Sequence, residues 1–253
     1  SKVPFAEVNP GVVFTAIKEG AALHIVSDDV LTVAEFVWAV KPDSPIRSVK
    51  DFKGKKIGYT NPRSTSQALA NLLLQSGGYK PEDAELVKTG GFGEGVAALE
   101  LGQIDIAPIP EPLWSKYKAK FRVVASAKDQ LPPLDNVVGV ATPEMMASKG
   151  DFIRAVIRAR RKAVEFMYSN PDEAGDIVAK VYNLDPAVAR SAVRNLITSN
   201  TNGIPYWGNG QIHLEGLKRM IDVQKSVGAL SGDFDYGKIV DNRFLPDDIK
   251  AIK

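Results

Sequence analysis

Cysteine is absent from this sequence of 253 residues, and histidine occurs only twice. The absence of cysteine excludes disulfide bonds, thiolate nucleophiles and cysteine-based metal sites. His24 lies in a predicted core strand and His213 at a predicted helix start, and neither has the neighbouring nucleophile and orienting group that triad chemistry requires. Phosphate-loop and zinc motifs are also missing. These observations argue against an enzyme, and they indicate no catalytic residue, no metal and no cofactor.

A strong charge of either sign and a long apolar run are missing as well. The formal net charge is +2, so the sequence gives no electrostatic reason to expect nucleic acid or an acidic membrane as the main partner. One basic cluster at helical spacing is interpreted as a solvated helix face; it comprises Arg154, Arg158, Arg160, Arg161 and Lys162. No apolar run reaches membrane-spanning length, and no signal peptide is recognisable at Ser1. With 44% apolar and 25% charged residues, the chain is predicted to form one large or two medium soluble domains.

The stretch 51–78 predicts a strand, a tight loop and a helix with a polar start. Residues 55–60 have strand character and end before Asn61-Pro62. The hydroxyl groups at 64–66 are suited to cap a helix, and leucines then repeat at helical spacing until Gly77-Gly78. Such a helix start presents free N–H groups and partial positive charge, to which Arg63 adds a full charge. An ordinary cap with a surface arginine is an equally good interpretation of this stretch taken alone.

Strands and helices alternate along the first part of the chain, which predicts an α/β fold. Further strands are predicted at 3–6, 23–27, 34–40, 84–88, 104–107, 122–126 and 136–141, with helices at 12–19, 94–101 and 113–118 and a proline-rich turn at 108–112. This alternation argues for a parallel sheet with helices on both faces. Lys41–Pro45 is predicted to cross between domains. From Pro143 the chain is predicted to be helical, with apolar stripes that belong to the core.

An internal similarity bears on the start of the chain. Residues 3–27 and 104–126 share the order strand, polar turn, helix, strand. If both domains follow one plan, the unit formed by residues 55–102 needs a counterpart before Val3. We therefore expect roughly 50 to 60 residues of the first domain, and any export signal, upstream of Ser1, because the lobe otherwise has an open sheet edge.

Three runs carry a resemblance to a known family: AEFVWAVKPDSPIRSVKDFKGKKIGYTNPRSTSQALANLL, VAALELGQIDIAPIPEPLW and RAVIRARRKAVEFMYSNPDEAGDIVAK. They resemble the periplasmic solute-binding proteins of ABC importers, in the NMT1/THI5-like branch that includes binders of nitrate, taurine, alkanesulfonates and thiamine-precursor pyrimidines. The resemblance covers nearly the whole chain, and its most specific parts are DSPI followed by DFKGKKIG, and ALELGQIDIA.

The resemblance implies a type II periplasmic binding fold, with two doubly wound lobes joined by a two-strand hinge. Lobe one would comprise residues 1–40 and 136–253, including a helical C-terminal tail packed on it, and lobe two residues 41–135. The hinge strands would be 36–40 and 137–141. The resemblance further implies an exported monomer in the periplasm or another extracytoplasmic location that passes a small polar or anionic organic solute to permease and ATPase subunits.

The candidate ligand-binding residues lie beyond the carboxyl ends of predicted strands, where open α/β sheets bind ligands. They are Asn9, Gly11, Asn61, Arg63, Ser64, Thr65, Ser66, Gly91, Phe92 and Glu111. By matching position, Asn61 and the hydroxyls at 64–66 would hold an acidic group, with Asn9 and Gly11 facing them. The role of Glu111 is open: it would pair with Arg63, bind an amino group, or contact solvent. One helix terminus contributes about 0.3 to 2 kcal/mol, whereas micromolar capture needs about 8 kcal/mol, so groups from both lobes are expected.

Two alternatives remain open. One is an enzyme resembling the pyrimidine-precursor synthase of the same branch, although that relative uses a histidine and a cysteine-rich motif. The other is the ligand-sensing domain of a signalling receptor. Gly93-Glu94-Gly95 matches a loose dinucleotide fingerprint after a strand, but no acid ends the next strand, and chance explains the match better.

Overall fold

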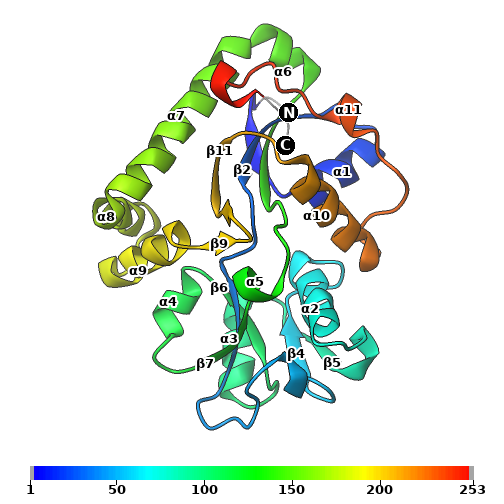
Figure 1. Cartoon of the computed structure of the whole chain (residues 1–253), viewed down its shortest axis with the longest axis vertical. Coiled ribbons are helices and arrows are strands. Elements are labelled where there is room, and N and C mark those ends of the chain that lie inside the picture. The colour runs from blue at the N-terminus through cyan, green and yellow to red at the C-terminus, as the bar shows by residue number, and fades with distance from the viewer. Residues whose placement is uncertain (1–2, 251–253) are drawn as a thin grey trace.

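The computed structural model describes residues 3–250, which form two main sheets covered by helices and one short two-stranded sheet (Figure 1). The strands are β1 (Ala6–Val8), β2 (His24–Val30), β3 (Phe36–Val40), β4 (Lys56–Tyr59), β5 (Glu85–Lys88), β6 (Ala107–Pro110), β7 (Arg122–Ser126), β8 (Val137–Ala141), β9 (Asn200–Thr201), β10 (Ile204–Pro205) and β11 (Trp207–Gly210). The α-helices are α1 (Pro10–Lys18), α2 (Thr65–Ser76), α3 (Phe92–Glu100), α4 (Leu113–Tyr117), α5 (Ala127–Gln130), α6 (Pro143–Ser148), α7 (Gly150–Ser169), α8 (Pro171–Tyr182), α9 (Pro186–Ile197), α10 (Leu214–Ser226) and α11 (Tyr236–Ile239). The predicted α/β fold is confirmed.

The first sheet, in the upper part of Figure 1, has the order β1-β8-β2-β11 with antiparallel pairing throughout. Alternation along β2 determines which helices cover each face. Ile25 packs with Phe14 of α1 and Leu217 of α10, whereas Val26 packs with Ile153 of α7. The C-terminal helices therefore complete the core of the sheet to which the N-terminal strand β1 belongs.

The second sheet, in the lower part of Figure 1, contains an antiparallel unit, β6-β3-β7, and a parallel pair, β4-β5. A bridge between Ile57 and Ile106 joins the two units. Within residues 3–250, the expected parallel arrangement is thus restricted to β4-β5, this bridge and a second bridge between Ile25 and Val240. The turn predicted at 108–112 is also wrong in part, because Pro108 and Pro110 lie in β6. They are tolerated there because β6 pairs along 107–110 with β3 only, and proline is confined to strands that lack a second ladder.

Two segments, 31–35 and 131–136, connect the sheets. The strands expected to form the hinge flank these segments rather than cross between the sheets: β3 is the central strand of its unit and β8 lies between β1 and β2. The sequence analysis assigned β3 to lobe one, as the last part of residues 1–40, but β3 pairs with β6 and β7 of the second sheet.

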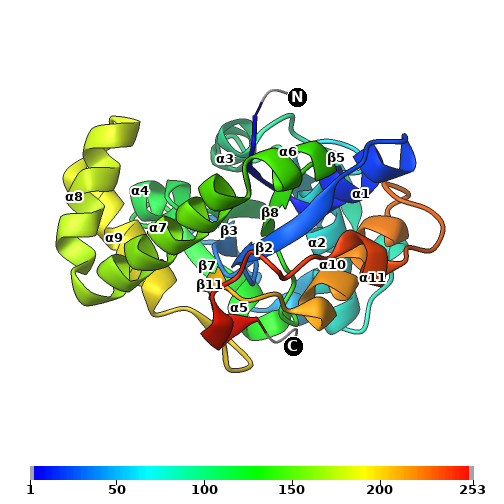
Figure 2. The ribbon, with the colours of Figure 1, turned by 90° about the horizontal axis from the view of Figure 1, so that it is seen from above.

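Two helix contacts also bridge the upper and lower parts of the molecule, one of them apolar and the other polar. Met220 and Val223 of α10 join the apolar cluster that contains Leu69 of α2. On the other side, α9 contacts α4 through hydrogen bonds: the Oγ of Ser191 accepts from Lys118 Nζ at 2.7 Å and from Ser115 Oγ at 3.0 Å. Figure 2 shows α4 and α9 on one side of the molecule and α2 and α10 on the other.

The basic cluster on α7 is only partly a solvated face. The side chain of Arg160 is 16% exposed and lies against Glu7 and Asp29, with N···O distances of 3.4 and 3.3 Å. It also donates to the carbonyl oxygens of Gly208 and Asp29. The prediction was wrong for this residue because β11 packs on α7 at that position.

Among residues 3–250, no helix combines the length and the apolar composition that a membrane span requires.

Helices α8 and α9 pack so closely that a glycine is required between them. A Cβ atom on Gly175 would lie 2.6 Å from the backbone Cα of Arg190, so Gly175→Ala must push the helices apart. We expect this change to lower the free energy of unfolding by about 1–3 kcal/mol. Gly93→Ala is the matched control, because its Cβ meets nothing within 4 Å and alanine favours a helix by up to about 1 kcal/mol. Urea denaturation of both variants measures the difference; equal stabilities would contradict the packing argument.

Candidate functional site

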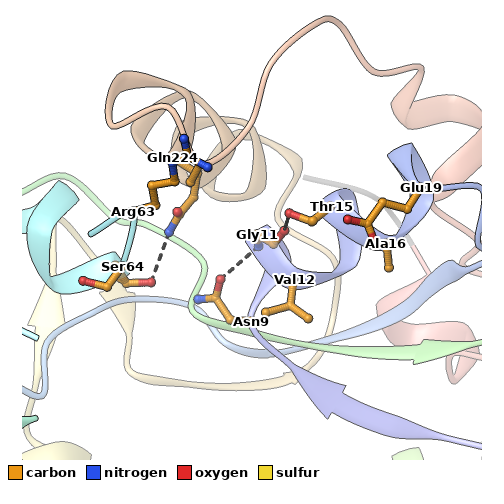
Figure 3. Close-up of a pocket in the computed structure, with 11 residues that line it drawn as sticks. Asn9, Gly11, Val12, Thr15, Ala16, Glu19, Arg63, Ser64 and Gln224 are labelled. Carbon is orange, nitrogen blue, oxygen red and sulfur yellow. Dashed lines mark hydrogen bonds between the residues drawn. The ribbon is translucent and has the colours of Figure 1, made fainter. Parts of the chain in front are cut away.

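A cavity of about 460 Å³ lies between α1, α2 and α10 (Figure 3). Five of the ten predicted ligand-binding residues line it together: Asn9, Gly11, Arg63, Ser64 and Thr65. The remaining lining residues are Val12, Thr15, Ala16, Glu19, Gln224 and Ala229. Residues from the start of the chain, from α2 and from the C-terminal helices therefore meet at one place.

The first wall of the cavity is the start of α1. Asn9 caps this helix, because its Oδ1 accepts from Gly11 N at 2.9 Å while Pro10 occupies the first helical position (Figure 3). Its Nδ2 donates to the carbonyl oxygen of Asn136 at 3.1 Å, in the second connecting segment. A Cβ atom on Gly11 would lie 3.1 Å from Asn9 Oδ1 and 3.2 Å from Gln224, so this position has little room for a side chain. The hydrogen bond from Asn9 to Asn136 thus ties the cap of α1 to the second connecting segment.

The second wall is the start of α2. Ser64 caps this helix by accepting from Gln67 N at 3.3 Å. Arg63 precedes the cap in a left-handed backbone conformation, with φ of 64°, and its N–H donates to Gln67 Oε1 at 2.7 Å. The side chains of Ser64 and Thr65 are half-buried at the cavity, and that of Arg63 is exposed beside them.

Ser66 does not belong to the cavity, although the sequence analysis placed it in the site. Its side chain is 2% exposed, and its Oγ accepts from Thr60 N at 2.9 Å and lies 2.9 Å from Ser64 Oγ. The prediction was wrong because successive helical residues are rotated by about 100°, which turns Ser66 from the cavity toward β4. The hydroxyl of Ser66 instead holds the loop that leads from β4 to α2.

Gln224 is a lining residue that the sequence analysis missed. Its side chain is 4% exposed, and its Nε2 donates to Thr65 Oγ1 at 3.1 Å, so α10 is hydrogen-bonded to the first residue of α2. A signal was present in the sequence: Gln224 continues the buried stripe of Leu217 and Ile221 at helical spacing, where a polar residue needs a partner.

The electrostatics of the cavity favour an anion. The starts of α1 and α2 both present partial positive charge, worth about 0.3–2 kcal/mol each toward an anion. Backbone N–H groups are left for a ligand at α2 only, because Pro10 has none and those of Gly11, Val12 and Val13 donate to Asn9. Arg63 adds a full positive charge, and Glu19 is the acidic residue of the lining. The arrangement can therefore hold one small anionic group between two helix starts from different parts of the chain.

The other predicted ligand-binding residues lie elsewhere. The amide of Asn61 is exposed and donates to Gly90 O at 3.1 Å, and Gly91 caps α3. Phe92 packs against Phe36 at 5.5 Å between ring centroids and belongs to the apolar cluster beneath α2. None of these three lines the cavity between α1 and α2. They support the loops around β4 and β5 rather than the cavity wall.

Glu111 lies in a second cavity of about 190 Å³, whereas Arg63, its suggested partner, lines the first. Its Oε1 accepts from Asn195 Nδ2 at 2.6 Å, and its Oε2 from Ser115 N at 3.1 Å. Tyr206 and Trp207 pack edge to face at 5.1 Å, and the 9% exposed Tyr206 anchors the loop that contains them. Among residues 3–250, no group of three or more acidic or histidine side chains is placed to hold a metal ion.

Comparison with known proteins identifies similar chains. A family model described as "NMT1/THI5 like" matches residues 1–174. A Brucella abortus protein named only as a binding protein is 30% identical over 154 residues, which are 59% of this chain and 47% of the relative. The riboflavin-binding protein RibY of Chloroflexus aurantiacus is 24% identical over 218 residues, covering 81% of this chain and 60% of RibY. This chain thus spans about half the length of the Brucella relative.

Two solved structures show the same fold. The periplasmic aliphatic sulphonate binding protein SsuA from Escherichia coli has a TM-score of 0.79 at 20% identity, over 93% of this chain and 74% of SsuA. The desulfurization enzyme DSZB has a TM-score of 0.71 at 13% identity, over 95% of this chain and 83% of DSZB. At these identities the likeness extends to the fold alone. Both binding proteins and an enzyme therefore share the architecture.

Proposed function

This chain belongs to the NMT1/THI5-like family, and from that premise we propose that it is the solute-binding component of an ABC importer. It captures a small anionic organic solute, of the sulfonate, taurine or nitrate kind, in the cavity between α1, α2 and α10. It acts outside the cytoplasm, as a monomer, and delivers the solute to permease and ATPase subunits. It performs no chemistry on the solute.

One observation carries this proposal. The starts of α1 and α2 are more than fifty residues apart in the sequence, yet both line a single cavity of about 460 Å³, together with Arg63. The two parts of the molecule act as lobes that close on the solute, with the connecting segments 31–35 and 131–136 as the hinge. Contacts from both lobes supply the binding energy that one helix start lacks. The names of the relatives support a binding role, since the Brucella protein, RibY and SsuA are all named as binding proteins.

The ligand class can be tested by thermal shift. At about a hundred times its dissociation constant, a true ligand adds roughly 2.7 kcal/mol of stability, which raises Tm by roughly 5–10 °C for a chain of this size. The panel comprises taurine, short alkanesulfonates, nitrate, aromatic carboxylates, aminopyrimidines and riboflavin, with the alcohol of the same chain length as the control for each sulfonate. We expect a sulfonate or a related anion to raise Tm and its alcohol to leave Tm unchanged. A shift with riboflavin alone, or with no compound, would remove the proposed ligand class.

A further inference from the structure

The second cavity differs from the first in its charge. It lies where the first connecting segment, the turn after β6, the end of β7 and the end of α9 meet. Two acidic side chains, Glu35 and Glu111, line it together with polar groups that include Ser126 and Asn195. Lys128, its one basic lining residue, is exposed. Two short helices begin at this cavity, since Glu111 accepts from Ser115 N in the first turn of α4 and Ser126 precedes α5. The two acids nevertheless outnumber Lys128 in the lining, so with both acids ionised its formal charge is negative and favours a positively charged group.

Glu35 is a buried acid whose hydrogen bonding is incomplete. Its side chain is 8% exposed, and its Oε1 accepts from Asn136 Nδ2 at 2.5 Å. Its Oε2 has no hydrogen-bond partner within the described range 3–250. A buried acceptor that is left unpaired costs about 1–3 kcal/mol, and more when it is charged. Burial accordingly raises the pKa of Glu35 to about 8, although hydrogen bonding from its own backbone and from Asn136 lowers it.

Glu111 supplies a second acceptor that is held in position. Its two oxygens accept from Ser115 N and Oγ, both at 3.1 Å, and from Asn195 at 2.6 Å. The backbone N–H of Glu111 donates to the carbonyl oxygen of Glu35 at 3.0 Å, which fixes the two acids relative to each other. Each carboxyl oxygen can accept two hydrogen bonds. The two side chains therefore offer acceptor capacity that the protein itself does not fill.

We propose that this second cavity binds the protonated amino group of a small organic amine, with Glu35 and Glu111 as its hydrogen-bond acceptors. An ammonium group provides three donors and a full positive charge, which matches two carboxylates better than any neutral group of similar size does. The cavity of about 190 Å³ has room for the amino group and a short carbon chain. This site is separate from the anion cavity, from which Asn9 and Asn136 divide it.

Binding of an amine must be coupled to a proton on Glu35. An ammonium beside the carboxyl favours its charged form, so the Glu35 proton leaves when the amine binds. Other groups close to Glu35 are Asn136, Glu111 and the rim residue Lys128, and Tyr206 interacts electrostatically with Glu35, Glu111 and Arg160. None of these provides the missing donor to Oε2. The affinity for amine should therefore rise with pH between about 6 and 8.

The test is a carboxyl ¹³C NMR titration of the full chain, with and without n-propylamine, and with 1-propanol as the neutral control. The Glu35 signal is assigned by its loss in Glu35→Gln, a change that preserves the size of the side chain. We expect saturating propylamine to lower the Glu35 titration midpoint by at least one pH unit, and 1-propanol to leave it in place. A midpoint that propylamine does not move would overturn the proposal.

Affinities of variants provide a second readout. We expect Glu35→Gln and Glu111→Gln each to weaken propylamine binding at least tenfold at pH 8. Glu35→Gln should also abolish the pH dependence of propylamine binding. Glu173→Gln, a change at an exposed residue, is the control and should bind propylamine as the unchanged protein does. If Glu35→Gln bound propylamine as tightly as the unchanged protein does, the proposal would also be overturned. Binding of the anionic ligand at the first cavity is measured in parallel and should be unaffected by Glu35→Gln, so failure of either site is distinguishable from failure of the other.

Discussion

Replacing Thr65 with aspartate is expected to weaken the binding of an anionic solute by roughly 100-fold. Thr65 is the first residue of α2 and lines the first cavity, so the new carboxylate would face the bound anion. At about 5 Å and an effective dielectric of about 20, the repulsion is about 3 kcal/mol, which corresponds to this factor. Isothermal titration with the ligand found in the thermal-shift panel measures the loss.

The control for this variant is Thr65→Asn, which has nearly the same size as aspartate and carries no charge. Both replacements remove the acceptor for Gln224 Nε2 at the Thr65 hydroxyl, and each provides a carbonyl oxygen in its place. Thr65→Asp should fold at least as well as the original protein, because a negative charge at a helix start stabilises it by about 0.3–1 kcal/mol. A rise in Tm together with a loss of affinity would be hard to explain by misfolding. Equal affinities for the aspartate and asparagine variants would place the anion elsewhere.

The second large effect concerns pH, because a pair of buried acids lies beside the second connecting segment. Asp28 of β2 is fully buried, and Asp135 is 1% exposed. Burial raises the pKa of Asp135 to about 7, although a hydrogen bond with Asp28 and the Arg219 charge oppose the rise. Burial and the neighbouring Asp135 raise the pKa of Asp28 as well. The two carboxyls therefore share a proton at neutral pH, and each titrates as part of the pair.

Because the folded-state pKa of Asp135 lies above its unfolded value of about 3.9, the stabilising contribution of its proton is complete below pH 4. It is lost as the pH rises toward 7, at about 1.4 kcal/mol per pH unit. We expect the free energy of unfolding to fall over this window in urea titrations. Asp135→Asn should reduce the slope by about that amount, since the amide N–H can donate to Asp28 without taking up a proton. The exposed Asp43→Asn is the control, and an unchanged slope in Asp135→Asn would contradict the shared proton.

Local signals were sufficient to predict both helix starts of the first cavity. The run of hydroxyl residues at 64–66 and the leucine spacing placed α2 correctly, because caps and periodicity are properties of neighbouring residues. Asn9 and Gly11 were identified as site residues, although α1 begins at Pro10, two residues before the predicted start. Proline is well suited to the first helical position, and this accounts for the earlier start.

The remaining parts of the site depend on tertiary packing, which the local sequence does not specify. Glu111 follows a strand as expected, but the bridge to β4 is made by Ile106, just before β6, and the turn after β6 faces α9 instead of α2. Glu35 and Asp135 lie in connecting segments without periodicity, so nothing in the sequence indicates that they are buried. Only the path of the chain between the two sheets brings Glu35 to Asn136 and Asp28 to Asp135.

The two helix contacts that bridge the sheets have unequal costs of separation. Moving α10 away from α2 exposes Met220 and Val223 to water, and burying a side chain of this size is worth about 1.5–3 kcal/mol. Moving α9 away from α4 exchanges hydrogen bonds within the protein for hydrogen bonds to water, at a net cost of about 0.5–1.5 kcal/mol each. Separation therefore costs more at the α10 and α2 contact, which adjoins the first cavity, than at the α9 and α4 contact, which adjoins the second.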